Sequence, residues 1–235
     1  MQPSFIPWLG YFELIDYVDK FIFLDIVQLN QRSWQTRNKL KNLDKEYLIS
    51  LPIMKTNSQQ NSFIKDALLD FRQYDFRIKL SKTIEQNYKK SNFFSEVHPF
   101  VLELIFYETV FLSEYTINII QKIVQKLGIQ TQIIVLSKTN YEKTSNKGDL
   151  ILDLCQFFET NMYISPLGSK TYLQAKKSEF THSNINIKYQ NYNHPIYNQL
   201  GENFIPYIGI FDILYNEGFK KSLEIIRSGR QYENR

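Results

Sequence analysis

The apolar residues at the start of the chain are grouped as expected for a short helix followed by a buried strand. Pro3 and Pro7 prevent a helix from starting before Trp8. From Trp8 to Val18 the apolar residues recur at helical spacing. The continuous apolar run 21–24 is typical of a parallel strand, which is buried on both faces.

Most of the remaining sequence alternates between strand-like and helical patterns. Strands are predicted at 47–53, 129–136, 162–164 and 185–189, and helices at 148–158 and 208–214. Segment 63–69 is predicted to be a short strand or a helical turn, and the tail after Ile226 is expected to be frayed.

The middle of the chain is helical. Residues 74–86 form one predicted helix, and residues 92–127 form two helices or one kinked helix that ends at Gly128. Because strands and helices alternate around this segment, the sequence predicts an α/β fold with a mostly parallel, Rossmann-like sheet and flanking helices. We expect a single domain over residues 1–235, with the helical segment, about 70–127, as a layer or insertion.

Composition limits the kind of ligand. The apolar content of 43% is sufficient for a full core, and the net charge of +4 is spread along the chain. This mild positive excess permits an anionic small molecule such as a nucleotide sugar, but it does not indicate a nucleic-acid surface. The oligomeric state stays open.

Cysteine use and hydropathy favour the cytoplasm. The single cysteine, Cys155, excludes an internal disulfide, and its place on an apolar helix face indicates a small buried residue rather than a nucleophile. No apolar run approaches the roughly 18 residues of a membrane span, and no secretory signal is visible.

A dense group of polar residues follows the first predicted strand. These residues are Asp25, Gln28, Asn30, Arg32, Arg37 and Asn38. Ligands of open parallel sheets bind outside the carboxyl ends of the strands, so this loop is a candidate binding site. Arg32 and Arg37 can grip a diphosphate through their guanidinium groups, or can instead pair with Asp25 or Asp19. Asp25 itself can orient a sugar hydroxyl, accept a proton, or pair with Arg37.

A second candidate loop follows the strand predicted at 162–164. It contains Ser165, Pro166 and Gly168, and small residues there allow backbone N–H groups to approach an anion. An ordinary turn explains the same residues.

His194 is the candidate general base, because an imidazole titrates near neutral pH. Pro195 holds it in an extended conformation, and Tyr197 and Gln199 alternate beyond it as further ligand-binding candidates. The alternative is a histidine that donates to a backbone carbonyl and fixes its loop. The three histidines and one cysteine give no metal-ligand spacing, and no cofactor motif is found.

Four blocks of the sequence together resemble the WbqC-like family. They are the run from Gln2 to Leu40 (QPSFIPWLGYFELIDYVDKFIFLDIVQLNQRSWQTRNKL), YISPLG at 163–168, HPIYNQ at 194–199 and FIPYIGIFDILYNEG at 204–218. Many members of that family have Asn in place of Ser165 and Gly in place of Ser169.

The resemblance implies a bacterial protein of surface-polysaccharide or lipopolysaccharide O-antigen biosynthesis. The reaction we expect is transfer of an acyl or aminoacyl group onto a nucleotide-linked amino sugar, with Arg32 and Arg37 holding phosphate and His194 assisting the amine. One alternative is a non-catalytic nucleotide- or sugar-binding protein. The other is a divergent nucleotidylyltransferase-like enzyme, against which the absence of histidines near Trp8 counts.

The segment from Gln2 to Gly10 has two interpretations. A ligand can lie over the turn from Trp8 to Gly10, or the turn can be an aromatic loop that packs against the sheet. Family members usually have an apolar first strand before Gln-Pro, whereas this sequence begins at Met1, so we expect that strand to be missing, very short or encoded upstream. The sequence also predicts that Trp8, Arg37, Ser165 and His194 face one cavity.

Overall fold

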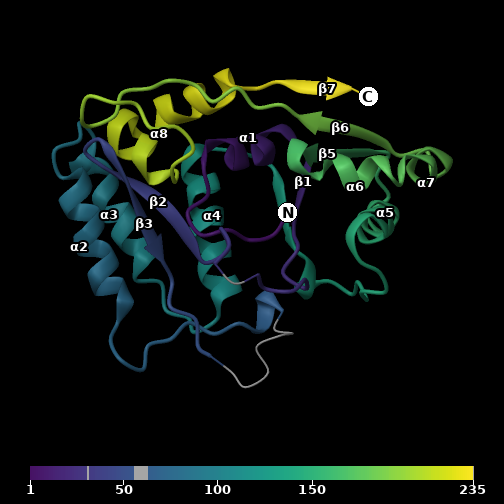
Figure 1. The fold of residues 1–235 in the computed structure, drawn as a ribbon, viewed down its shortest axis with the longest axis horizontal. Coiled ribbons are helices and arrows are strands. Elements are labelled where there is room, and N and C mark those ends of the chain that lie inside the picture. The colour runs from purple at the N-terminus through teal and green to yellow at the C-terminus, as the bar shows by residue number, and fades with distance from the viewer. Residues whose placement is uncertain (31, 56–62, 235) are drawn as a thin grey trace. The chain divides into compact units, whose positions relative to one another are not determined.

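The computed structural model describes residues 1–30, 32–55 and 63–234 (Figure 1). The chain divides into two units. The first unit contains residues 1–138 and 194–228, and the second contains residues 139–193 and the end of the chain from Gly229. Each unit has its own strands and helices. The single domain expected over the whole chain stays a prediction.

The first unit contains the helical segment and two pairs of strands. Its elements are α1 (Leu9–Tyr17), β1 (Lys20–Phe23), β2 (Arg37–Asn42), β3 (Lys45–Ser50), η1 (Ile64–Asp66), α2 (Phe76–Tyr88), α3 (Phe94–Ile105), α4 (Leu112–Leu127), β4 (Gln132–Val135), η2 (Leu136–Lys138) and α8 (Phe211–Ser228). The three helices α2 to α4 occupy the predicted helical middle, which is therefore confirmed, as two helices rather than one between residues 92 and 127.

Two of the three strands predicted in this unit, at 21–24 and 129–136, form a parallel pair. The third, predicted at 47–53, is present as β3. β1 lies beside β4, with Phe21 opposite Ile133. The first residue lies along β1 as well, because the Met1 amino group donates to the Ile22 carbonyl at 2.7 Å and the Met1 carbonyl accepts from the Leu24 N–H at 2.8 Å. These bonds fix the N-terminal segment at the sheet before the chain turns into α1.

Strand β2 corrects the prediction that the polar segment up to Asn38 is a loop. Arg37 and Asn38 instead begin an antiparallel hairpin with β3, closed by a short turn in which Leu43 has φ of 51°. The inward face of β2 carries Asn38 and Leu40, which are 4% and 0% exposed. Hydrophobic periodicity misses this strand because a polar side chain occupies half of its buried face.

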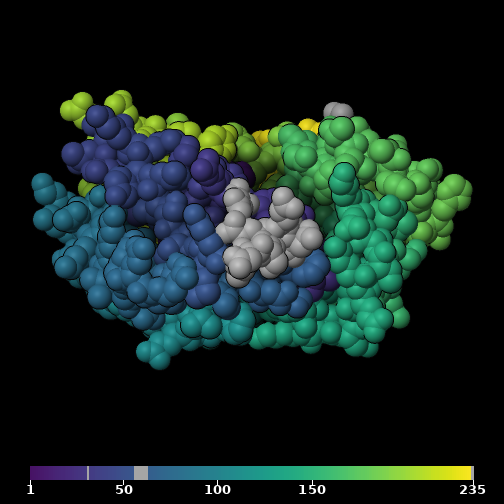
Figure 2. All heavy atoms as spheres, turned by 60° about the horizontal axis from the view of Figure 1, so that its bottom comes forward, coloured from purple at the N-terminus to yellow at the C-terminus, as the bar shows by residue number. Residues whose placement is uncertain are grey.

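Helix α2 packs against the hairpin and α3, and in Figure 2 the atoms of the hairpin and of α2 form adjoining parts of the surface.

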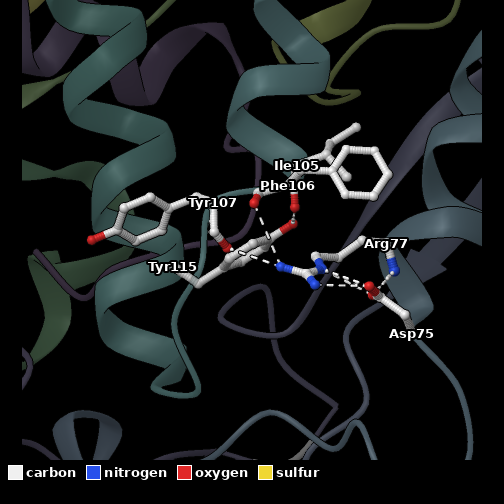
Figure 3. A network of polar contacts seen from close by, with 6 residues as sticks. All are labelled: Asp75, Arg77, Ile105, Phe106, Tyr107 and Tyr115. Carbon is white, nitrogen blue, oxygen red and sulfur yellow. Dashed lines mark hydrogen bonds and ion pairs between the residues drawn. The ribbon is translucent and has the colours of Figure 1, made fainter.

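A polar network at the start of α2 is shown in Figure 3. The Asp75 carboxylate caps α2 by accepting from the Arg77 N–H at 3.0 Å and also accepts from the Arg77 Nε at 2.9 Å. Arg77 Nη1 donates to the Tyr107 carbonyl at 3.4 Å, and the Tyr115 hydroxyl donates to the Ile105 carbonyl at 2.8 Å. The network ties the start of α2 to the end of α3.

The second unit is built around a three-stranded sheet. Its elements are α5 (Lys147–Phe157), β5 (Met162–Pro166), η3 (Leu167–Ser169), α6 (Lys170–Gln174), α7 (Lys177–His182), β6 (Asn186–Gln190) and β7 (Tyr232–Asn234). β6 pairs parallel with β5 and antiparallel with β7, so the frayed tail predicted after Ile226 is wrong. Cys155 is buried in α5, and burial raises the pKa of its thiol to about 12, as suits a structural cysteine.

The fold is therefore mixed α/β, as predicted, but its described strands form short pairs and one three-stranded sheet. A continuous Rossmann-like sheet is not confirmed. Among the described helices, none is both long and apolar enough to cross a membrane.

Candidate functional site

The candidate site of the first unit begins with an N-terminal loop that is held by β2. The Asn38 amide donates to the carbonyls of Phe5 and Ile6 at 2.9 and 2.7 Å, and its oxygen accepts from the Lys39 N–H at 2.8 Å. Two buried carbonyls of the loop are thereby satisfied. The structure gives Asn38 a framework role, and its predicted contact with substrate stays a prediction.

Gly10 lies beneath the indole of Trp8. A Cβ atom at Gly10 would lie 2.3 Å from Cη2 of Trp8, so only glycine permits the ring to lie across the start of α1. Gly10 therefore sets the orientation of Trp8, and no direct approach to a ligand is needed to explain it.

Trp8 lies in a group of rings from distant parts of the chain, which we call the aromatic cluster: Trp8, His194, Tyr197, Phe204 and Tyr207. The Trp8 and His194 rings are stacked, with centroids 6.1 Å apart and an interplanar angle of 10°. The Tyr207 ring meets both edge-on, at 5.4 Å from Trp8 and 4.9 Å from His194. Trp8 and His194 are half-buried and Tyr207 is 57% exposed, so one side of the cluster faces solvent.

Both ring nitrogens of His194 have backbone partners. Nε2 accepts from the Tyr207 N–H at 3.2 Å, and Nδ1 lies 2.9 Å from the Pro195 carbonyl, which fixes the Nδ1–H tautomer. Burial lowers the pKa of His194, with the Pro195 bond acting in the opposite direction. The imidazole is thus neutral near pH 7 and connects two loops. This is the alternative role for His194, a histidine that donates to a backbone carbonyl and fixes its loop.

A buried carboxylate, Asp212, lies behind this cluster at the start of α8. Its Oδ2 accepts from the Tyr197 hydroxyl at 2.9 Å, and that hydroxyl accepts from Gln199 Nε2 at 3.1 Å. Gln199 is itself fixed by two bonds with the Ile205 backbone, of 2.8 and 3.0 Å. Oδ1 of Asp212 is buried and has no hydrogen-bond partner among the described residues.

Burial raises the pKa of Asp212 to about 6, although Tyr197, Tyr88 and Lys41 all act to lower it. Lys41 is 2% exposed, and its Nζ donates to the Asn203 carbonyl. The Lys41 N–H donates to the Tyr88 hydroxyl at 3.1 Å. A carboxyl that titrates near neutral pH beside a hydroxyl is a group that can exchange protons.

Sequence reasoning missed Asp212, Tyr88 and Lys41. Asp212 does lie in the block FIPYIGIFDILYNEG, where it is a single acid inside an apolar run. An acid inside an apolar run is the signal that could have identified it, since burying a charge is costly.

Asp25, the other predicted catalytic residue, joins the ends of β1 and β4. Its carboxylate accepts from the Ser137 N–H at 3.0 Å and from the Ser137 hydroxyl. It is 1% exposed. Among the described residues, Asp25 is therefore bonded to Ser137 and not to Arg37, the ion-pair partner that the sequence also allows. A catalytic role for Asp25 stays a prediction.

The remaining candidates fall into two places. Gln2 accepts from the Gln35 amide at 2.8 Å, Arg32 is exposed, and Arg37 extends from β2, all in the first unit. Ser165 is buried in β5, and Gly168 lies in η3 with no atom within 4 Å of the point that a Cβ would occupy, both in the second unit. The predicted cavity shared by Trp8, Arg37, Ser165 and His194 stays a prediction. No group of metal-ligating side chains is found within the described ranges.

Comparison with known proteins gives a family and one relative. The model of the WbqC-like protein family matches residues 2–224. The chain is also 28% identical, over 220 residues, to the uncharacterized protein Rv1507c of Mycobacterium tuberculosis, an alignment that covers 93% of this chain and 92% of the relative. No solved structure matches.

Proposed function

Because the chain belongs to the WbqC-like protein family, we propose that it is a cytoplasmic transferase of surface-polysaccharide biosynthesis. It moves an acyl or aminoacyl group onto the amine of an amino sugar that is linked to a nucleotide. The observation that carries the proposal is the half-exposed aromatic cluster in front of Asp212, a buried carboxyl with one unpartnered oxygen among the described residues.

The aromatic cluster suits a sugar ring. The face of an indole is electron-rich, and the C–H bonds on one face of a pyranose are weakly positive, so the two stack. Gly10 beneath Trp8 and His194 stacked on it fix the indole within the cluster. Tyr207 is exposed at the edge of the cluster, so its ring is the one most open to contact with a sugar.

Asp212 and Tyr197 supply the proton chemistry in this proposal. The sugar amine forms a C–N bond with the carbonyl carbon of an activated acyl donor, whose leaving group departs with its electron pair. The nitrogen loses a proton to the Tyr197 hydroxyl, which passes its own proton to Asp212 along their 2.9 Å hydrogen bond. A carboxyl with a pKa of about 6 is ionised at neutral pH and can accept that proton.

Variants of His194 distinguish a stacking role from a base. His194→Phe keeps a ring but has no lone pair, and His194→Gln keeps hydrogen bonding but has no ring. We expect the phenylalanine variant to retain turnover within about 10-fold, because it keeps the ring that stacks on Trp8. The glutamine variant should lose more, because it loses aromatic contacts worth about 0.5–1.5 kcal/mol. Asp212→Asn is expected to lower kcat by about 10²–10⁴-fold, the range for a lost general base.

The measurement is mass spectrometry of nucleotide-linked amino sugars incubated with the protein and a panel of acyl and aminoacyl donors. Acylated product from the wild type establishes the reaction. A loss of about 10²-fold or more in His194→Phe, with Asp212→Asn unaffected, would return the base role to His194.

A non-catalytic sugar- or nucleotide-binding protein is the second candidate. The two predicted catalytic residues favour it, because the polar atoms of His194 and Asp25 form hydrogen bonds within the protein. A nucleotide sugar that remains bound in native mass spectrometry, with no donor in the panel giving product, supports this candidate.

A further inference from the structure

A second group of side chains in the first unit lies on and before β2, with Trp34 exposed and two half-buried cations beside it, and we call it the Trp34 face: Trp34, Arg37 and Lys39. Along β2 side chains alternate, so Arg37 and Lys39 share one face while Asn38 and Leu40 point into the core. The guanidinium carbon of Arg37 and the Nζ of Lys39 each lie 5.9 Å from the centre of the Trp34 indole.

Two features of the Trp34 face are unexplained by packing. Trp34 is 52% exposed, although it is one of only two tryptophans in the chain. The Nε atom of Arg37 is buried and has no hydrogen-bond partner among the described residues. A buried N–H of a charged group without an acceptor is costly, so an anion bound to the exposed part of the same guanidinium would offset part of that cost.

The backbone of Trp34 and the side chain of Gln35 contact the N-terminal segment. The Trp34 carbonyl accepts from the Phe5 N–H at 2.9 Å. The Gln35 side chain is buried, accepts from the Asn30 N–H at 3.0 Å and donates to Gln2 at 2.8 Å. These bonds fix the backbone at Trp34 and Gln35, which lowers the entropy lost when a ligand binds.

An exposed indole flanked by two cations is suited to a ligand that is flat at one end and anionic at the other. Aromatic rings stack on any nucleobase, and arginine binds phosphate through its fork of N–H donors. Lys39 is partly neutralised by Glu46, whose carboxylate lies 2.6 Å away, so the face carries few cations for a nucleic-acid backbone. A single nucleotide fits it better than a polymer.

We propose that the Trp34 face binds the nucleoside diphosphate part of a nucleotide-linked sugar, with the base on Trp34 and the diphosphate on Arg37 and Lys39. This inference rests on the proposed function for its substrate, and it assigns to the first unit a nucleotide site separate from the aromatic cluster. Because stacking is tolerant of base identity, uridine and guanosine diphosphates should bind with similar affinity.

The two tryptophans allow each site to be observed alone. Trp8→Phe leaves Trp34 as the only indole, and Trp34→Phe leaves Trp8. Uridine diphosphate is expected to quench the fluorescence of the Trp8→Phe variant and not that of Trp34→Phe. Quenching confined to Trp34→Phe would place the base on the aromatic cluster and overturn the inference.

Calorimetry with uridine diphosphate tests the cation in the otherwise unchanged protein. Arg37→Met is expected to weaken binding about 10- to 100-fold, the effect of losing a charge-assisted hydrogen bond. Arg72→Met is the matched control, because it removes an exposed arginine that pairs with Asp70 and should leave affinity within about 2-fold. Equal affinities for wild type and Arg37→Met would contradict the inference.

The outcomes separate this inference from the proposed function. Binding of uridine diphosphate at Trp34 without acyl transfer in any assay supports the nucleotide site and rejects the transferase. Acyl transfer without quenching of Trp34 rejects the nucleotide site alone.

Discussion

Replacement of Gly218 by alanine is expected to lower the free energy of unfolding by about 2–4 kcal/mol, through backbone strain and overpacking together. Gly218 interrupts α8 with φ of 71° and ψ of 174°, a conformation that side chains with a Cβ rarely adopt. A Cβ there would also lie 2.7 Å from the Phe93 ring. Because α8 is buried on both sides of this kink, neither segment can shift without disturbing the core.

Gly128→Ala is the matched control for Gly218→Ala. Gly128 ends α4 with φ of 75° and ψ of 22°, and no atom lies within 4 Å of the point that a Cβ would occupy there. Its replacement introduces strain without a clash and should cost about 1–2 kcal/mol. Urea unfolding at constant m-value gives both differences. If Gly218→Ala were no more harmful than Gly128→Ala, the kink of α8 would be unnecessary to the fold.

The parts of the fold that were predictable from sequence are those in which apolar residues alone define an element. The runs at 21–24 and 129–136 form the parallel pair β1–β4, and the helical stretch up to Gly128 is present. Both depend on burial of apolar side chains, which leaves a local pattern in the sequence. The sheet as a whole was not predictable, since strand pairing joins segments whose separation no local pattern encodes.

The strand that hydrophobic periodicity fails to predict, β2, has a polar residue on its buried face. The consecutive polar residues Arg37, Asn38 and Lys39 predict a loop where β2 begins. Asn38 is nevertheless buried, and its amide donates to two carbonyls of the N-terminal loop. Tertiary hydrogen bonds replaced hydrophobic burial on that face. Sequence periodicity cannot register such a bond, because the acceptor lies far away along the chain.

The candidate site was partly predictable for the same reason. The local sequence indicates Trp8 and His194 as candidates, and their rings are stacked in the structure. Two contacts cannot be deduced from the sequence. The Tyr207 N–H donates to the imidazole of His194, and the Tyr197 hydroxyl donates to Asp212. Burial shifts the pKa values of His194 and Asp212, and burial is a property of the folded chain that no local pattern shows.

Stability should depend on pH through Asp212. The pKa of its carboxyl rises from 3.8 to about 6 on folding, so the folded state binds the proton more tightly than the unfolded state. The resulting stabilisation is fully present below about pH 4 and is lost as the pH rises through about 6. Over that interval the free energy of unfolding should fall by about 3 kcal/mol relative to Asp212→Asn, in which this titration is absent.

Denaturant unfolding of both proteins between about pH 4 and 8 measures the difference, in which all other titrating groups cancel. Asp70→Asn is the opposite control, because the hydrogen bond from Arg72 lowers the pKa of Asp70, and its stabilisation is lost as the pH falls rather than as it rises. A difference between wild type and Asp212→Asn that stays constant with pH would mean that Asp212 titrates as an ordinary carboxylate. The proton acceptor assigned to the transferase would then have no special basicity, and the reaction would need a different base.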